Sequence, residues 1–215
     1  MPRPGWDEDS PRLWANLDRV ADLVIKDATA GAMPSIDMAR GWHRMMMQGL
    51  EIPGDAPRAG MFRGDPDAPV WPVKIGGVRC PRCEYVAALL ERFEAKLRSD
   101  IAALDKKYPR VEDLDAAGIH AALGLAAWAH AEWVHIHPFA NGNGRTARAW
   151  ANFVLRRFGI PPAIKLRPRP DGNYSAAAAA SMVGDLDPTI RVFISMIREA
   201  ITGSTPQTPR RNLPK

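Results

Sequence analysis

A chain of 215 residues is long enough for one hydrophobic core with short extensions. Its apolar content of 46% is ordinary for a soluble protein, and no run of about 18 or more apolar residues predicts a membrane span. The net charge of +5 arises from Lys and Arg residues that are mostly interleaved with Asp and Glu, so no basic stripe with aromatic residues favours nucleic-acid binding.

The N-terminal residues 1–9 are polar and lack the apolar centre of a secretory signal. We therefore expect a cytoplasmic protein, and the sequence leaves open export as an effector by a signal-free route. The two cysteines, Cys80 and Cys83, form one Cys-x-x-Cys pair. A structural zinc site needs four ligands and no second pair exists, so an incidental thiol pair is expected.

The first part of the chain predicts a short leader followed by helices. Residues 1–9 are expected to form a mobile leader. Ser10 and Pro11 are typical of the N-cap and first position of a helix, whose apolar residues recur at helical spacing until Gly31. Ser35 is expected to cap a second helix, in which His43 is interpreted as a packed side chain.

Residues 50–84 are rich in Gly and Pro and lack helical periodicity. Within them, residues 70–78 indicate a strand that runs into a tight turn at Gly76 and Gly77, which predicts a β-hairpin. An ordinary surface hairpin is the alternative to a functional one.

Helical patterns return after this segment. Apolar residues follow one stripe of residues 86–108, and residues 116–135 are rich in alanine. Further helices are predicted over residues 145–158, from Tyr174 to residue 183, and over 190–201. These patterns predict one all-α domain over residues 10–202, and the polar, proline-rich residues 203–215 are expected to be a disordered tail.

The stretch from His137 to Arg148, His-Pro-Phe-Ala-Asn-Gly-Asn-Gly-Arg-Thr-Ala-Arg, combines four chemical features. A histidine can act as a general base near neutral pH. A glycine-rich turn exposes backbone N–H groups, and the N-terminus of the following helix favours negative charge. Arg145 and Arg148, three residues apart, fall on one face of that helix. This combination indicates a site for a polyphosphate beside a hydroxyl group.

The same stretch resembles the signature of Fic-domain proteins, His-Pro-Phe-x-(Asp/Glu)-Gly-Asn-Gly-Arg-x-x-Arg, and departs from it only at Asn141. Residues 60–63, Gly-Met-Phe-Arg, resemble a short stretch that precedes this signature in the family. The pattern from Tyr174 to Gly184-Asp185 also resembles part of the Fic core. The resemblance implies a Fic-type helical bundle with a short β-hairpin, called the flap, beside the active site.

The resemblance also implies an activity, the transfer of AMP from ATP to a Ser, Thr or Tyr hydroxyl of a target protein, with release of pyrophosphate. His137 would be the catalytic base. Gly142, Asn143 and Gly144 would offer N–H groups and a small amide to the phosphates. Arg145 and Arg148 would hold the terminal phosphates, where a planar guanidinium fits better than an ammonium group.

Two further sets of residues acquire expected roles from the resemblance. Tyr174 and Met182 would lie at the adenosine end of the nucleotide, with core packing as the alternative. The flap would bind the target by strand addition. Its candidate residues are Val73, Lys74, Ile75 and Gly76.

Asn141 replaces the carboxylate with which the family usually binds Mg²⁺, and it offers one neutral oxygen instead. Three interpretations stay open: AMP transfer with Asn141 as a weak magnesium ligand, transfer of another phosphate-containing group, or a degenerate, non-enzymatic module that binds a nucleotide or partner.

Many Fic proteins are inhibited by a helix with the pattern (Ser/Thr)-x-x-x-Glu-(Gly/Asn). The nearest match here, residues 195–200, lacks the final Gly or Asn. Either a separate small antitoxin supplies the glutamate, or the protein is not inhibited in this way. A homo-oligomer is also left open.

Overall fold

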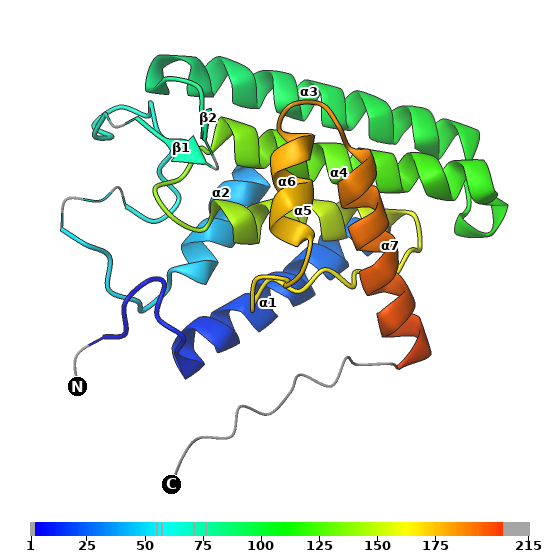
Figure 1. The fold of residues 1–215 in the computed structure, drawn as a ribbon, viewed down its shortest axis with the longest axis horizontal. Coiled ribbons are helices and arrows are strands. Elements are labelled where there is room, and N and C mark those ends of the chain that lie inside the picture. The colour runs from blue at the N-terminus through cyan, green and yellow to red at the C-terminus, as the bar shows by residue number, and fades with distance from the viewer. Residues whose placement is uncertain (1–2, 55, 57, 71, 76, 204–215) are drawn as a thin grey trace, which may run out of the picture.

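The computed structural model describes residues 3–54, 56, 58–70, 72–75 and 77–203 (Figure 1). These residues form an all-α fold with one small antiparallel hairpin, which confirms the predicted fold class. Over the described residues, no helix combines the length and apolarity needed to cross a membrane. The α-helices are α1 Pro11–Thr29, α2 Ile36–Met46, α3 Cys83–Lys107, α4 Ala116–Ile136, α5 Asn143–Arg157, α6 Tyr174–Ser181 and α7 Asp187–Thr202.

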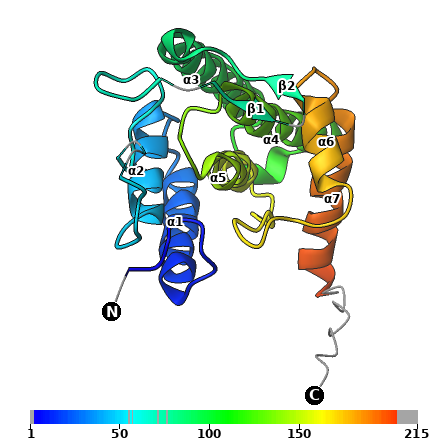
Figure 2. The same ribbon diagram turned by 60° about the vertical axis from the view of Figure 1, so that its left-hand side comes forward.

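Helix α5 is the centre of the bundle. Figure 2 shows it nearly end-on, with α1 and α2 on one side, α3 and α4 above, and α6 and α7 on the other side. Nearly all of its residues are buried, as expected for a helix that is covered all round. Trp150 of α5 is fully buried and contacts Trp42 of α2 edge-on, with ring centroids 4.6 Å apart, and Trp133 of α4, at 5.9 Å. These aromatic contacts fix α5 against its neighbours.

The helix starts follow from their capping residues. The Ser10 hydroxyl accepts a hydrogen bond from the Leu13 N–H at 3.2 Å, and the Ser35 hydroxyl accepts one from the Met38 N–H at 3.4 Å. Both predicted N-caps are therefore confirmed. Helix α5 begins at Asn143, two residues before the predicted start, because Gly142 serves as its N-cap.

Residues 3–9, expected from the sequence to be a mobile leader, contact the folded domain. The Trp6 N–H donates to the Glu51 carbonyl at 3.0 Å, and the Glu51 N–H donates to the Pro4 carbonyl at 2.8 Å. Asp7 forms an ion pair with Arg145 of the central helix. The polar residues of this segment suggested a leader surrounded by solvent. In the structure its backbone pairs with Glu51 and its Asp7 carboxylate pairs with Arg145, so the segment lies against the domain. Of the expected tail, residues 204–215 lie outside the described residues.

The hairpin pairs strand β1 Lys74–Ile75 with strand β2 Val78–Arg79. Lys74 lies opposite Arg79, and Ile75 lies opposite Val78. The Cys80 N–H donates to the Val73 carbonyl at 3.0 Å and extends the pairing by one step. The structure thus contains the predicted hairpin, while Gly76 at its turn lies outside the described residues.

Arg63 connects the segment after the hairpin to the end of α4. Its side chain is buried, and its guanidinium donates to the carbonyls of His137 at 2.7 Å, Ile136 at 2.8 Å and Pro81 at 3.1 Å. Its backbone N–H also donates to the Pro138 carbonyl at 2.6 Å. The last carbonyls of a helix have no partner within it, and Arg63 supplies one here. The segment that directly follows the hairpin therefore lies beside His137.

We predict that Arg63→Met destabilises the protein strongly, because it leaves three carbonyl groups in a buried region without their donor. Each buried acceptor left unsatisfied costs about 1–3 kcal/mol, so the free energy of unfolding should fall by about 3 kcal/mol or more. Urea unfolding followed by circular dichroism measures this. The matched control is Arg58→Met, whose side chain is exposed and whose effect should stay within about 0.5 kcal/mol. Similar losses in both variants would contradict the role given to Arg63.

Candidate active site

His137 ends α4 with a backbone in the left-handed region, at φ 51°. Its ring Nδ1 lies 3.2 Å from the Val134 carbonyl, so the Nδ1–H donates and the Nε2 lone pair points elsewhere. The pKa of His137 is lowered to about 4, mainly by burial and also by the positive charge of Arg63, against the opposing effect of the Val134 carbonyl. The imidazole is therefore neutral near pH 7, with Nε2 as the basic atom.

Phe139 and Asn143 close the loop that follows His137. The Phe139 N–H donates to the Asn143 Oδ1 at 2.9 Å, and the Asn143 Nδ2 donates to the Phe139 carbonyl at 2.7 Å. Both residues are buried, with Phe139 completely enclosed. The sequence suggested that the Asn143 amide would face the phosphates. In the structure this amide is engaged within the loop, which leaves the backbone N–H of Asn143 for an anion.

His43 holds the same loop from α2. The Gly60 N–H donates to its Nδ1 at 2.8 Å, so its Nε2 carries the proton and donates to the Asn141 carbonyl at 3.0 Å. The ring stacks on Phe139 with centroids 3.8 Å apart. Burial lowers the pKa of His43 to about 4, and the charges of Arg145 and Arg44 act in the same direction. The sequence predicts only a packed side chain for His43 and gives no signal of this role, because 98 positions separate His43 from Asn141.

Gly142 has a positive φ of 82° at the N-cap of α5. A Cβ at this position would lie 3.1 Å from the Met47 Cε and 3.3 Å from the His43 Cδ2, closer than most Cβ contacts. Glycine is thus required both by the backbone conformation and by the packing of α2 beneath the loop.

The N-terminus of α5 faces the loop with backbone N–H groups that precede the first helical hydrogen bond. The first helical bond runs from the Thr146 N–H to the Gly142 carbonyl at 2.9 Å. The N–H groups of Asn143, Gly144 and Arg145 therefore precede the helical hydrogen-bond pattern. Together with the helix dipole they form a positive end that favours a phosphate.

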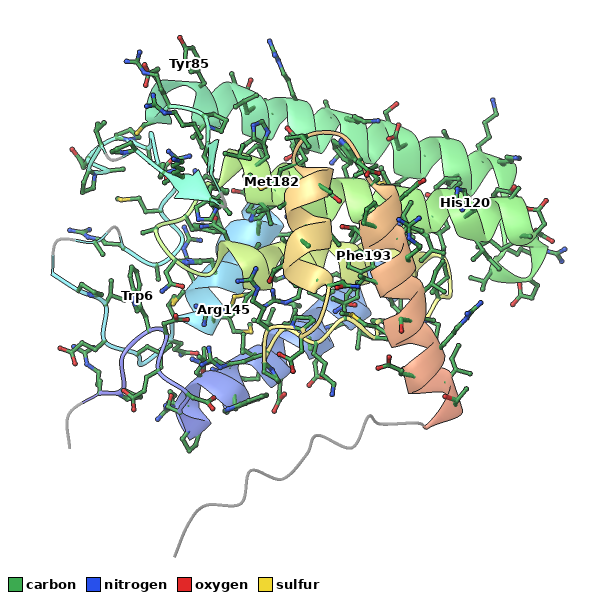
Figure 3. The ribbon with its side chains drawn as sticks, in the orientation of Figure 1. Trp6, Tyr85, His120, Arg145, Met182 and Phe193 are labelled. Atoms are coloured by element: carbon green, nitrogen blue, oxygen red, sulfur yellow. The ribbon has the colours of Figure 1, made fainter. Side chains whose placement is uncertain are left out.

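Arg145 is 5% exposed and lies under the N-terminal segment, near Trp6 in Figure 3. Its Nη2 donates to the Asn141 Oδ1 at 2.7 Å and to the Asp7 Oδ1 at 3.3 Å. Burial lowers the pKa of Arg145 to about 10; Asp7 opposes this shift, and the charges of Arg167 and Arg148 add to it. The guanidinium stays charged at pH 7.

Arg148 and Tyr174, which the sequence places at opposite ends of a nucleotide, are hydrogen-bonded to each other. The Arg148 Nη1 donates to the Tyr174 hydroxyl at 3.3 Å, and its Nη2 donates to the Leu166 carbonyl at 2.6 Å. The Arg148 Nε is buried without a partner among the described residues. The same hydroxyl lies 2.6 Å from Nε2 of the fully buried His130. Tyr174 thus joins α6 to α4 and α5, and little of it is exposed.

Met182 follows the last residue of α6 and is partly buried (Figure 3). Its expected place at the adenosine end stays a prediction, as does that of Tyr174. In the hairpin, Lys74 is exposed and Val73 and Ile75 are partly buried, so the expected target-docking flap offers both polar and apolar groups.

Asn141 offers poor support for a magnesium site held by the protein alone. Its Oδ1 already accepts the short hydrogen bond from Arg145. No group of three or more His, Cys, Asp or Glu side chains that could hold a metal occurs among the residues that the structure describes. Mg²⁺ prefers several oxygen ligands, usually with a carboxylate among them. The residues present therefore do not fit a protein-held magnesium ion.

Comparison with known proteins gives relatives of this fold and signature. A protein adenylyltransferase Fic of Drosophila melanogaster is 34% identical over 174 residues, which are 79% of this chain and 30% of that protein. That of Drosophila persimilis is 34% identical over 119 residues, 55% of this chain and 20% of that protein. The chain therefore spans less than a third of the length of these curated relatives.

Solved structures show the same fold. A Fic-domain-containing signalling protein from Bacteroides thetaiotaomicron superposes with a TM-score of 0.63 at 17% identity, covering 90% of this chain and 73% of the other. Fic-1 from Caenorhabditis elegans gives 0.58 at 24% identity, covering 95% of this chain and 56% of the other. The sequence profile of the Fic/DOC family matches residues 34–155, which include the hairpin and the complete signature loop. The chain belongs to the Fic/DOC family.

Proposed function

We propose that the protein is an adenylyltransferase that transfers AMP from ATP to a Ser, Thr or Tyr hydroxyl of a target protein. The observation that carries the proposal is a neutral His137, with Nε2 unprotonated, next to the positive N-terminus of α5. A base and an anion-binding helix end in one loop suit attack by a hydroxyl on a phosphate. The Drosophila relatives, named protein adenylyltransferases, support the same reaction type.

In the proposed reaction, Nε2 of His137 takes the proton of the acceptor hydroxyl. The oxygen forms a bond to the α-phosphorus of ATP, and the bond from this phosphorus to the bridging oxygen breaks, so that pyrophosphate leaves. The Val134 carbonyl, which accepts from Nδ1–H, holds the ring in the required tautomer and stabilises the imidazolium that forms.

The phosphates bind at the start of α5. Negative charge spreads over the phosphoryl oxygens in the transition state, so positioning and electrostatics supply most of the catalysis. The N–H groups of Asn143 and Gly144 are the proposed donors to these oxygens. Arg145 and Arg148 would hold the terminal phosphates, and both must exchange some of their present contacts to do so. No step is assigned to magnesium, because the donor set does not fit one.

The hairpin is the proposed docking site for the target. Its strands are two residues long, and the Pro81 carbonyl that follows them shares Arg63 with the His137 carbonyl. An extended target segment that pairs with this edge would bring its hydroxyl near His137. Because the same guanidinium holds both segments, their spacing is fixed.

We predict that His137→Ala abolishes AMP transfer while folding and ATP binding persist, because a base is needed only in the chemical step. The assay compares α-labelled with γ-labelled ATP on cell lysate and on the protein itself. Relative to lysate without the added protein, only the α-label should show extra incorporation, and only with the wild type. The matched control is His135→Ala, two residues away and partly exposed, which should transfer normally. Labelling by His137→Ala at the wild-type rate, or incorporation of the γ-label, would refute the proposed reaction.

The pH dependence of the rate follows from the lowered pKa of His137. The basic form is present above the folded pKa of about 4 and is lost as the pH falls through that value. Between about pH 5.5 and 8 the titration of His137 should therefore not change the transfer rate, whereas a histidine with an ordinary pKa would lose its basic form, and the rate would fall, below about pH 6.5. Initial rates measured across this range in wild type and in His135→Ala test the prediction. A midpoint near 6.5 in both proteins would contradict it.

A further inference from the structure

We propose that Arg167, which lies outside the signature, joins Arg145 in a two-guanidinium phosphate site, and that the Asp7 carboxylate occupies this site until a nucleotide phosphate displaces it. The inference rests on the proposed function in so far as the displacing ligand is the triphosphate of ATP. It adds one binding residue and one internal competitor to the site.

The Asp7 carboxylate lies between two guanidinium groups, and one of them, Arg167, also contacts the Asp9 Oδ1 through its Nε at 3.2 Å. The Asp7 Oδ1 lies 3.3 Å from the Arg145 Nη2 and 3.7 Å from the Arg167 Nη1. The Arg145 side chain is 6% exposed and that of Arg167 is 22% exposed, while that of Asp7 is 67% exposed. The carboxylate thus covers the buried guanidinium from the solvent side. A phosphate that reaches Arg145 by this side must take the place of the carboxylate.

The contacts of the carboxylate are loose. Charge-assisted bonds between a guanidinium and an anionic oxygen are usually about 2.7–2.9 Å long, and both Asp7 contacts are longer. The short bond of Arg145 is the one to the neutral Asn141 at 2.7 Å. Two planar forks offer more donors than one carboxylate can accept, and a phosphate group has more oxygens for them. The exchange of Asp7 for phosphate should therefore be favourable.

The charge around Arg145 also favours an anion with more than one negative charge. Both Arg167 and Arg148 lower the pKa of Arg145, so these three guanidinium groups repel one another. Asp7 is the acidic side chain paired with Arg145 among the described residues. A triphosphate would neutralise more of this positive charge than one carboxylate does.

The backbone segments that carry Asp7 and Arg167 are both held near the site by other contacts. On one side of Asp7, the segment pairs with Glu51 through the Trp6 N–H; on the other, the Asp9 carboxylate accepts from the Trp14 Nε1–H at 2.7 Å. Arg167 follows Leu166, whose carbonyl accepts from Arg148. The second signature arginine therefore fixes the backbone that presents Arg167. Displacement of Asp7 requires movement of its side chain and a shift of the Trp6 carbonyl, which also contacts Arg145, but it leaves the anchors in place.

The test measures binding of inorganic tripolyphosphate and of adenosine to the full chain by isothermal titration calorimetry. Asp7→Asn removes the competing charge and should tighten tripolyphosphate binding roughly tenfold; Arg167→Gln should weaken it by a similar factor. Adenosine binding should change in neither variant. The matched control is Glu8→Gln, which removes the same charge one residue away and whose carboxylate contacts the Gly5 N–H. It should change tripolyphosphate binding by less than about twofold.

In the double variant Asp7→Asn with Arg167→Gln, the gain from Asp7→Asn should shrink, because one of the two cations that hold the carboxylate is gone. Equal effects of Asp7→Asn and Glu8→Gln, an unchanged affinity in Arg167→Gln, or no measurable binding by either wild type or Asp7→Asn would overturn the inference. Thermal melts check that each variant is folded. Because the readout is binding, a protein that shows the predicted pattern but transfers no AMP would refute the proposed function and support this site.

Discussion

The candidate active site depends on side chains that hold the backbone of one loop. Arg63 binds the carbonyls of Ile136 and His137, and His43 binds the carbonyl of Asn141. The loop passes from a left-handed residue, His137, to a left-handed glycine, Gly142, and cannot satisfy these carbonyls by helical pairing. Side-chain donors from two distant segments therefore fix the position of the catalytic base relative to the start of α5.

The same burial that fixes the loop sets its protonation. The pKa values of His43 and His137 are lowered to about 4 mainly because their charged forms lose hydration, and nearby arginines act in the same direction. A neutral His43 is needed, because its Nδ1 must accept from the Gly60 N–H while its Nε2–H donates. A neutral His137 is needed to accept a proton. The positive charge of the site is thereby left to the guanidinium groups and to the end of α5, where an anion binds.

Local signals in the sequence predicted the helices, the caps at Ser10 and Ser35, the hairpin and the signature, because each depends on residues a few positions apart. The sequence did not reveal that His43 holds the loop or that Asp7 pairs with Arg145. These contacts join side chains to partners 98 and 138 positions away and leave no periodic pattern. The role of Asn143 could not be predicted for another reason. Its side-chain amide could bind a phosphate or the backbone of the loop, and only the structure shows that it binds the Phe139 backbone.

Two neutral histidine rings with opposite tautomers, His43 and His137, prepare the loop for the proposed proton transfer, and nuclear magnetic resonance of ¹⁵N-labelled histidine rings tests this most directly. At about pH 7, the spectra should show neutral His137 with its proton on Nδ1 and neutral His43 with its proton on Nε2. The variants His137→Ala and His43→Gln assign the two signals. The account predicts opposite tautomers for these two rings. A doubly protonated His137, or a neutral His137 with its proton on Nε2, would contradict it, because in neither form does Nε2 have the lone pair that the proposed base requires.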